Sequence, residues 1–197
     1  PTNKGGRYYV GFFQYENDQE AYFGLNWKEK GEIINSRIIN AINFINPDVV
    51  DKNGTKYYHR RDLNNDGKID TMCNWFAAEV LDKLDIDVPR HGGIFYPPHL
   101  NGRPKYKPHD ANYLYNYFTN NSKWESVNDV DAVVKAVQSD EVVVASSPGN
   151  PGHIAIVRPD SEIDNILVAQ AGWFTGKSLG INTAFGDNTP KYFKYVG

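Results

Sequence analysis

The last third of the chain alternates short β-branched apolar runs with turn-forming residues, and this pattern constrains the fold most. Four such runs cover residues 141–146, 153–158, 166–171 and 192–196, with Gly, Pro and Asn between them. Short apolar runs bounded by these residue types are typical of strands joined by turns. Because helical patterns come earlier in the chain, we predict an α+β domain with helices packed against an antiparallel sheet.

The first two thirds of the chain favour helices. Isoleucines recurring on one stripe predict an amphipathic helix over residues 32–46 that ends at Pro47. A second helix is expected to begin near Cys73, capped by Asp70 or Thr71. The remaining helical patterns cover residues 110–119 and 127–138.

Two other segments predict little regular structure. Residues 89–109 contain eight Pro or Gly, which predicts a long loop, and such loops in compact domains are often functional. Residues 1–31 are rich in Gly and aromatic residues, and we expect an irregular or β-containing arm packed on the main domain, residues 32–197.

Composition excludes several classes of protein. With 40% apolar residues among 197, the chain can bury a real core, and its single cysteine allows neither an internal disulfide nor a cysteine-rich zinc site. A net charge of −3 without a basic stripe argues against nucleic acid as a partner. No apolar run approaches the ~20 residues of a membrane helix, so we expect no membrane partner.

Cys73 and His153 are the candidate catalytic pair. Cys73 opens a predicted helix, where the orphan N–H groups and the helix dipole favour a thiolate. His153 opens a predicted strand after a Gly- and Pro-rich loop. A thiolate and an imidazole that exchanges its proton are the two parts of a cysteine hydrolase. A lone cysteine is more often a buried apolar residue, so this pairing is a hypothesis.

Gln170 is the candidate residue that orients the imidazole. It is the polar side chain in an otherwise apolar predicted strand. If residues 153–158 and 166–171 form a hairpin that pairs Arg158 with Asn165, His153 lies opposite Gln170. The amide oxygen then accepts the imidazole N–H, as the third member of a triad does. The alternative is that Gln170 ends its strand in solvent.

Two segments resemble the CHAP and NlpC/P60 families of papain-like peptidoglycan hydrolases. Residues 73–81, CNWFAAEVL, resemble their cysteine box, in which the nucleophile starts a helix and an aromatic residue follows two positions later. Residues 152–157, GHIAIV, resemble their Gly-His-apolar strand. The order of elements over residues 62–197 agrees, but residues 140–141 are Asp-Glu where the families usually have Gly-Asp, and Gln170 departs from their His, Asn or Glu.

The resemblance implies a papain-like fold and a specific chemistry. Cys73 attacks an amide carbonyl with His153 as general base, a thioester forms, and water hydrolyses it. The substrate is bacterial peptidoglycan, cut either between glycan and stem peptide or within the peptides. The Cys73 N–H is expected to form part of the oxyanion hole. A second donor cannot be assigned from sequence.

Residues 62–70 have the opening spacing of an EF-hand calcium loop. Oxygen-bearing side chains fall at positions one, three, five and nine, and Gly67 lies at position six. The expected calcium ligands are the side chains of Asp62, Asn64, Asp66 and Asp70 and the carbonyl of Lys68. Position twelve is Cys73 instead of Glu, which indicates a truncated, dockerin-like half loop with a structural ion. A metal-free surface turn is the alternative.

Histidines offer a second route to the same substrate. His91, His99 and His109 fall in the Pro- and Gly-rich segment and could form a zinc amidase site. Their spacing fits no helical or strand ligand pattern, so we expect them to flank the substrate instead.

Three function classes remain open at this point. The first is a monomeric peptidoglycan hydrolase, either a lysin, a wall-remodelling enzyme, or an antibacterial toxin accompanied by an immunity or inhibitor protein. The second is a calcium-stabilised wall-binding module in which Cys73 is merely buried. The third is an acyltransferase or transpeptidase on the same scaffold. Because the chain begins at Pro1, we expect a processed or trimmed chain from which any signal peptide has been removed. For a protein that acts on peptidoglycan, the expected location is secreted, periplasmic or wall-associated.

Overall fold

We describe the protein from a computed structural model. It describes residues 26–27, 33–34, 36–50, 54, 58, 72–96 and 105–197. Most of the expected N-terminal arm therefore lies outside the described residues, as do residues 59–71 with the expected calcium loop.

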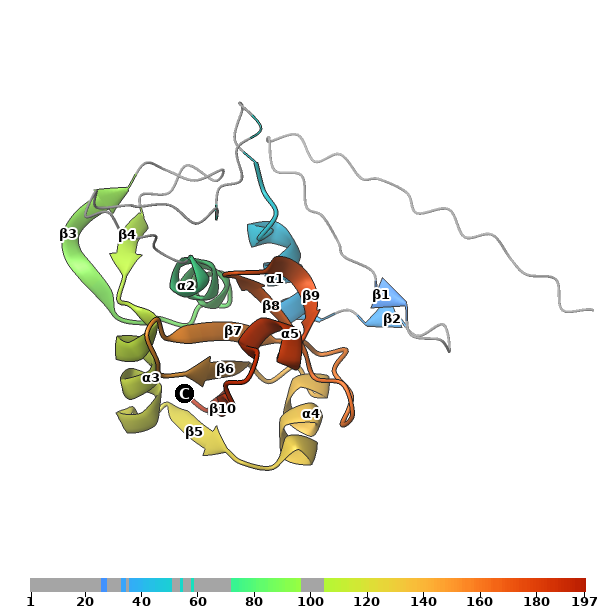
Figure 1. Cartoon of the computed structure of the whole chain (residues 1–197). Helices are drawn as coiled ribbons and strands as arrows, with labels where there is room; N and C mark the ends of the chain where they lie inside the picture. Colours follow the sequence, from blue (N-terminus) through green and yellow to red (C-terminus); the bar gives the residue numbers. More distant parts are fainter. Residues whose placement is uncertain are drawn as a thin grey trace, which may run out of the picture.

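A six-stranded antiparallel sheet forms the centre of the domain (Figure 1). Every neighbouring pair in it is antiparallel. In spatial order the strands are β5 (Trp124–Val127), β10 (Lys191–Tyr195), β6 (Val143–Ser147), β7 (His153–Val157), β8 (Leu167–Ala171) and β9 (Thr175–Gly180).

Helices cover both faces of this sheet, which confirms the α+β class. On one face, Ile154 and Ile156 of β7 share a core with three helices, α1 (Arg37–Ile45), α2 (Cys73–Lys83) and α3 (Ala111–Asn120). On the other face, Ala155 and Val157 share a core with α4 (Val130–Gln138) and α5 (Ile181–Phe185). Side chains alternate between the faces of a strand, so β7 contributes to both cores.

Two small hairpins lie outside the main sheet. β1 (Asn26–Trp27) pairs with β2 (Ile33–Ile34), and β3 (Arg90–Tyr96) pairs with β4 (Lys105–Pro108). The second hairpin occupies part of the predicted 89–109 loop, so that prediction was wrong for these residues. Its Gly and Pro residues accompany a shift in strand register between Arg90 and Phe95.

The first helix is shorter than its isoleucine pattern predicted. The Ser36 side chain accepts hydrogen bonds from the N–H groups of Ile38 and Ile39, so it caps α1 and fixes its start. The predicted residues Ile33 and Ile34 belong instead to β2. Asn46 caps the other end, at the predicted position.

Most other predicted elements are confirmed with shifts of a few residues. The N-cap of α2 is Met72, without a side-chain capping bond, instead of Asp70 or Thr71. The pattern at 127–138 contains the end of β5 as well as α4. The sequence did not reveal β9 or α5. Strand β9 contains glycines and has no clear apolar periodicity, and helix α5 is only five residues long.

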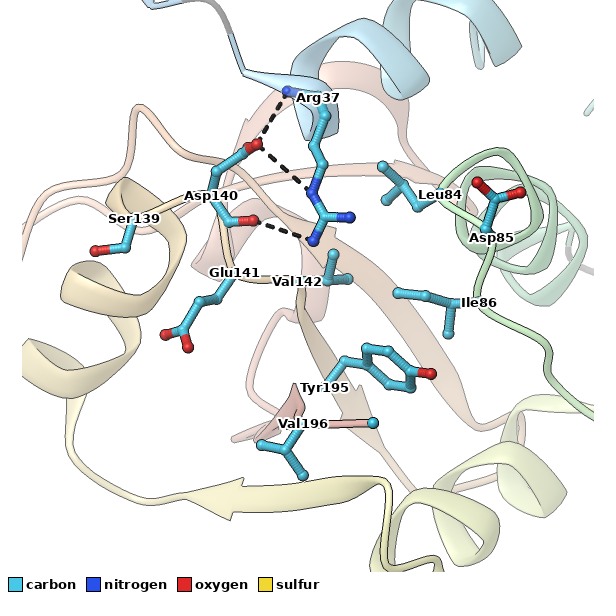
Figure 2. A pocket seen from close by; sticks show the side chains of 11 residues that line it. Arg37, Leu84, Asp85, Ile86, Ser139, Asp140, Glu141, Val142, Tyr195 and Val196 are labelled. Atoms are coloured by element: carbon cyan, nitrogen blue, oxygen red, sulfur yellow. Dashed lines mark hydrogen bonds and ion pairs between the residues drawn. The ribbon is translucent and has the colours of Figure 1, made fainter.

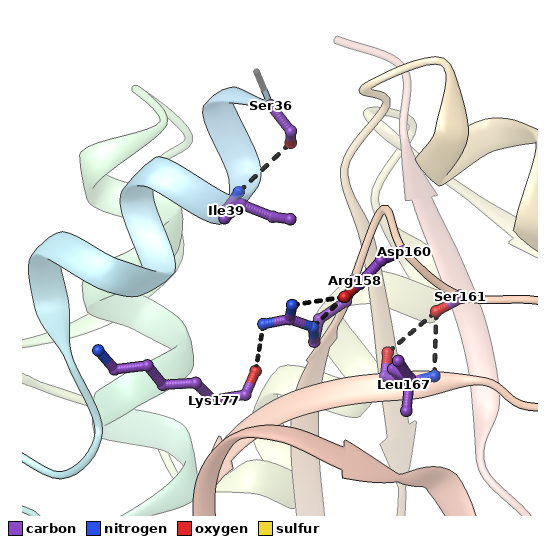
Figure 3. Close-up of polar contacts among 7 residues, drawn as sticks. All are labelled: Ser36, Ile39, Arg158, Asp160, Ser161, Leu167 and Lys177. Carbon is purple, nitrogen blue, oxygen red and sulfur yellow. Dashed lines mark hydrogen bonds and ion pairs between the residues drawn. The ribbon is translucent and has the colours of Figure 1, made fainter. Parts of the chain in front are cut away.

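A buried arginine links the end of β7 to β9 (Figure 3). Arg158 follows β7 and is 4% exposed; its guanidinium binds both carboxylate oxygens of Asp160 at 2.7 and 2.8 Å. It also donates to the carbonyl of Lys177 in β9 at 2.6 Å. A buried guanidinium with these partners is satisfied, so it holds β9 against the end of β7.

Candidate active site

The nucleophile candidate begins the most deeply buried helix of the domain. Every residue of α2 from Cys73 to Leu81 is buried. Two polar side chains within this stretch are hydrogen-bonded: the Asn74 amide donates to the carbonyl of His109 at 3.0 Å, and Glu79 accepts from the Tyr58 hydroxyl at 2.6 Å. Helix α2 is thereby fixed in register against its surroundings, and the position of Cys73 with it.

The loop before His153 is fixed by a residue of α3. The Asn112 side chain accepts from the Gly149 N–H at 3.0 Å and donates to the Gly149 carbonyl at 2.9 Å. A Cβ atom at Gly152 would collide with this amide, which explains why glycine precedes the histidine. The Ser146 hydroxyl also donates to the His153 carbonyl at 3.1 Å. These bonds set where β7 begins.

The imidazole of His153 lies between Cys73 and Gln170. It is hydrogen-bonded to the Cys73 side chain, and its Nε2 atom is bonded to Oε1 of Gln170. Phe185 of α5 meets the ring edge to face, with centroids 4.7 Å apart. The three residues predicted as a catalytic group are thus brought together, from α2, β7 and β8.

The pKa of His153 is raised above its ordinary value of about 6.5. Burial is the largest single influence and disfavours the imidazolium. The hydrogen bond and charge of Cys73, followed by the hydrogen bond to Gln170, together outweigh it. The site therefore favours the protonated form of the ring more than water does.

Gln170 determines which ring nitrogen faces the sulfur. Its side chain is fully buried, and its Nε2 group donates to the backbone carbonyl of Phe174 at 3.0 Å. A backbone carbonyl only accepts, so the amide oxygen must point to His153 and accept from the imidazole Nε2–H. Nδ1 is then the nitrogen left to exchange a proton with Cys73.

The strand register differs from the predicted one by two residues. Ile156 pairs with Ala169 and Val157 with Val168, and Arg158 bonds to Leu167 instead of pairing with Asn165. Extending this register places Gly172 opposite His153. A two-residue shift keeps side chains on the same face of the sheet, so Gln170 reaches the ring diagonally.

Gly172 leaves the space that the ring occupies. A Cβ atom on this residue would lie 2.9 Å from Cε1 of His153. The glycine is therefore part of the site, and a larger residue would displace the imidazole.

A stack of rings borders the start of α2. His109, whose carbonyl binds Asn74, lies 4.0 Å from the His91 ring and 3.8 Å from the Tyr113 ring. Burial and then the charge of His91 lower the pKa of His109, against the effect of Asp110. The third histidine of the zinc alternative, His99, lies outside the described residues.

No group of three or more His, Cys, Asp or Glu side chains within the described residues is arranged to hold a metal ion. The predicted calcium ligands from Asp62 to Asp70 lie outside that part of the chain, so the calcium site stays a prediction.

A surface hollow of about 670 Å³ lies at the opposite end of α2 (Figure 2). It is lined by Leu84 and Asp85, which follow the helix, and by the Arg37–Asp140 ion pair. An eleven-residue helix is ~16 Å long, so this hollow is separate from Cys73.

Sequence reasoning missed the residues that support the triad. Asn112, Gly172 and the Phe174 carbonyl act through contacts between elements, and no local pattern marks them. The one usable signal is a pair of glycines: Gly152, which precedes His153 in the sequence, and Gly172, which follows the strand of Gln170.

Neither protein-family models nor curated proteins match this chain. In the described part of the chain, each helix is too short or too polar to cross a bilayer. The geometry of the site is therefore the basis for a proposed function.

Proposed function

We propose that the chain is a papain-like cysteine hydrolase that cleaves an amide bond of bacterial peptidoglycan. The observation that carries this proposal is the imidazole of His153, hydrogen-bonded to Cys73 on one side and to Gln170 on the other. Cys73 starts a helix packed on an antiparallel sheet, and His153 starts a strand of that sheet, the arrangement expected of a papain-like fold.

The chemistry follows from the positions of the protons. With Nε2–H held by Gln170, Nδ1 of His153 takes the proton of the Cys73 thiol. The sulfur then bonds to the amide carbon, and the C–N bond breaks as the imidazolium gives its proton to the leaving amine. Water hydrolyses the thioester: His153 takes a proton from the water and returns it to the departing sulfur, which regenerates the site.

The oxyanion of each tetrahedral intermediate needs donors. First-turn N–H groups are not used by the hydrogen bonds of the helix itself, so the Cys73 N–H is the first donor. The neighbouring Asn74 amide donates one of its two N–H groups to the His109 carbonyl.

Muropeptide release tests the proposal most directly. Peptidoglycan is incubated with the native chain and with Cys73→Ser, and the soluble products are identified by mass spectrometry. We expect release by the native chain to fall at least 10³-fold in the variant, because the nucleophile is lost. Equal release by both chains contradicts the proposal, and the product masses distinguish an amidase from an endopeptidase.

One observation favours the second candidate, a wall-binding module without catalysis. Only 1% of the surface of Cys73 is exposed, as for an ordinary core cysteine. Alkylation by iodoacetamide at neutral pH separates the two candidates. A thiolate activated by His153 reacts in the native state and slows in His153→Gln, whereas a core cysteine reacts only on unfolding.

Several parts of the proposal need their own tests. An acyltransferase on this scaffold differs only in its acceptor, so an added amine acceptor distinguishes it by product mass.

Calcium at the Asp62–Asp70 loop would rigidify the approach to α2, and chelation would lower activity indirectly. A toxin would be blocked by a cognate immunity or inhibitor protein, whereas a lysin or remodelling enzyme needs none.

A further inference from the structure

The turn between β8 and β9 exposes two neighbouring aromatic side chains. Trp173 is 68% exposed and Phe174 is 58% exposed, the largest values among the large apolar side chains of the described residues. Large apolar side chains are usually buried, and an exposed pair of them marks a contact site for a ligand or partner.

This turn is attached directly to the candidate active site. The Phe174 carbonyl accepts hydrogen bonds from the Gln170 amide at 3.0 Å and from the Gly172 N–H at 3.1 Å. Gly172 itself packs against the His153 ring. The backbone that presents the aromatic pair therefore also orients the imidazole, so a ligand on the pair lies beside the reacting groups.

The turn carries no charge. Residues 165–176 contain no Asp, Glu, Lys, Arg or His. The stem peptides of peptidoglycan end in carboxylates and carry an amine or a further carboxylate, which charged partners recognise best. An N-acetylated sugar ring is neutral and presents a face of C–H groups, which suits the negative face of an indole.

We propose that Trp173 stacks on an N-acetylated sugar of the substrate, so that the site acts on stem peptides still joined to glycan. This inference rests on the proposed hydrolysis of peptidoglycan and names the part of that polymer which the turn recognises. A tryptophan has two side-chain torsions, so it provides a large contact area at a small entropic cost. Trp173 is then a specificity-determining residue, and the scissile bond lies close to the sugar.

Binding to a catalytically inactive chain tests this directly. The Cys73→Ala chain is titrated by calorimetry with a disaccharide–pentapeptide and with the same pentapeptide lacking the sugars. We expect the sugars to tighten binding roughly tenfold, a gain within the range found when nucleic-acid bases stack on aromatic side chains. Adding Trp173→Ala should abolish this gain and leave binding of the bare peptide unchanged.

Two further variants control for general effects. Trp173→Phe keeps an aromatic face and should retain part of the gain. Phe44→Ala removes an exposed aromatic ring that lies at 4.0 Å from the Lys83 ammonium, near the opposite end of α2 from Cys73, and should change neither affinity.

The inference fails if Trp173→Ala leaves the sugar-dependent gain intact, if it weakens both ligands equally, or if neither ligand binds. These outcomes are separate from failure of the proposed hydrolysis, which is decided by muropeptide release from the native chain and Cys73→Ser. Release that requires Cys73, together with any of these binding outcomes, overturns the role of Trp173 alone.

Discussion

Polar side chains from other elements lie near the two ends of helix α2, and their environments differ. At its start, Gln170 is fully buried, and both ends of its amide are hydrogen-bonded, one to His153 and the other to the Phe174 carbonyl. Near its far end, Arg37 and Asp140 form an ion pair at 3.6 Å whose side chains are 56% and 35% exposed.

This contrast distinguishes buried polar groups, which fix the orientation of a neighbouring side chain, from exposed polar groups, which do not. A buried amide must be satisfied, and only one orientation of Gln170 satisfies it, so burial determines the tautomer of His153. The exposed ion pair can exchange its partners for water at little cost. We therefore expect substitutions at the two ends of α2 to have very different effects.

Among substitutions that keep the nucleophile, the largest effect is expected from Gln170→Leu. The ring of His153 loses the acceptor that fixes its tautomer, and the rate of hydrolysis should fall by roughly 10²-fold, as when a positioned proton-transfer group is lost. The measurement is kcat on soluble muropeptides. Gln138→Leu removes a similar amide-to-carbonyl bond, to Ser161 at 3.1 Å, away from the site, and should leave kcat unchanged. Equal rates in both variants would remove the orienting role.

A smaller loss is expected from Gly172→Ala. The added Cβ would lie 2.9 Å from the His153 ring, so the ring must shift, and a misplaced catalytic group should cost about tenfold in kcat. Gly180→Ala is the matched control on the same sheet edge, because its Cβ would meet only the Asn165 side chain at 3.9 Å. Both variants are compared by kinetics and by thermal unfolding. A fully active Gly172→Ala enzyme would show that the ring tolerates displacement.

The raised pKa of His153 should depend on the sulfur. In Cys73→Ala the hydrogen bond and charge of Cys73 are lost while burial remains, so the pKa of His153 should fall below that of the native chain. Gln170→Leu should lower it less, since its hydrogen bond is the weaker influence. An NMR titration of the ring measures both shifts. An unchanged pKa in Cys73→Ala would mean that the thiol and the ring do not interact.

The same shift fixes the sign of a pH effect on stability. Because the folded-state pKa is raised, the contribution of His153 is full below the unfolded value of about 6.5 and is lost as the pH rises through the folded-state pKa. The stability advantage of the native chain over His153→Gln should therefore shrink as the pH is raised, which urea unfolding at several pH values measures.

The smallest effect is expected at the far end of α2. Arg37→Ala should change the free energy of unfolding by less than about 1 kcal/mol, because the ion pair is exposed. Hydrolysis should be unchanged, since the residue lies at the end of α2 remote from Cys73. A loss of activity in this variant would show that the two ends of the helix are coupled.

Much of the fold follows from local patterns. The amphipathic residues of α4 and the nearly continuous apolar runs of β7 and β8 are local signals, which is why these elements were predicted with small shifts. Strand β9 was missed because its residues are half-exposed and include two glycines, which leaves no apolar alternation to detect.

The sequence by itself determined the candidates: a cysteine at a helix start, a histidine at a strand start and a polar residue in an apolar strand. It determined their chemistry because residue type and position in an element are local properties. Only the tertiary structure decided that Gly172 lies opposite His153 and that the Phe174 carbonyl turns the Gln170 amide. Strand register and the orientation of a buried amide depend on contacts between distant segments, and no local pattern encodes those contacts.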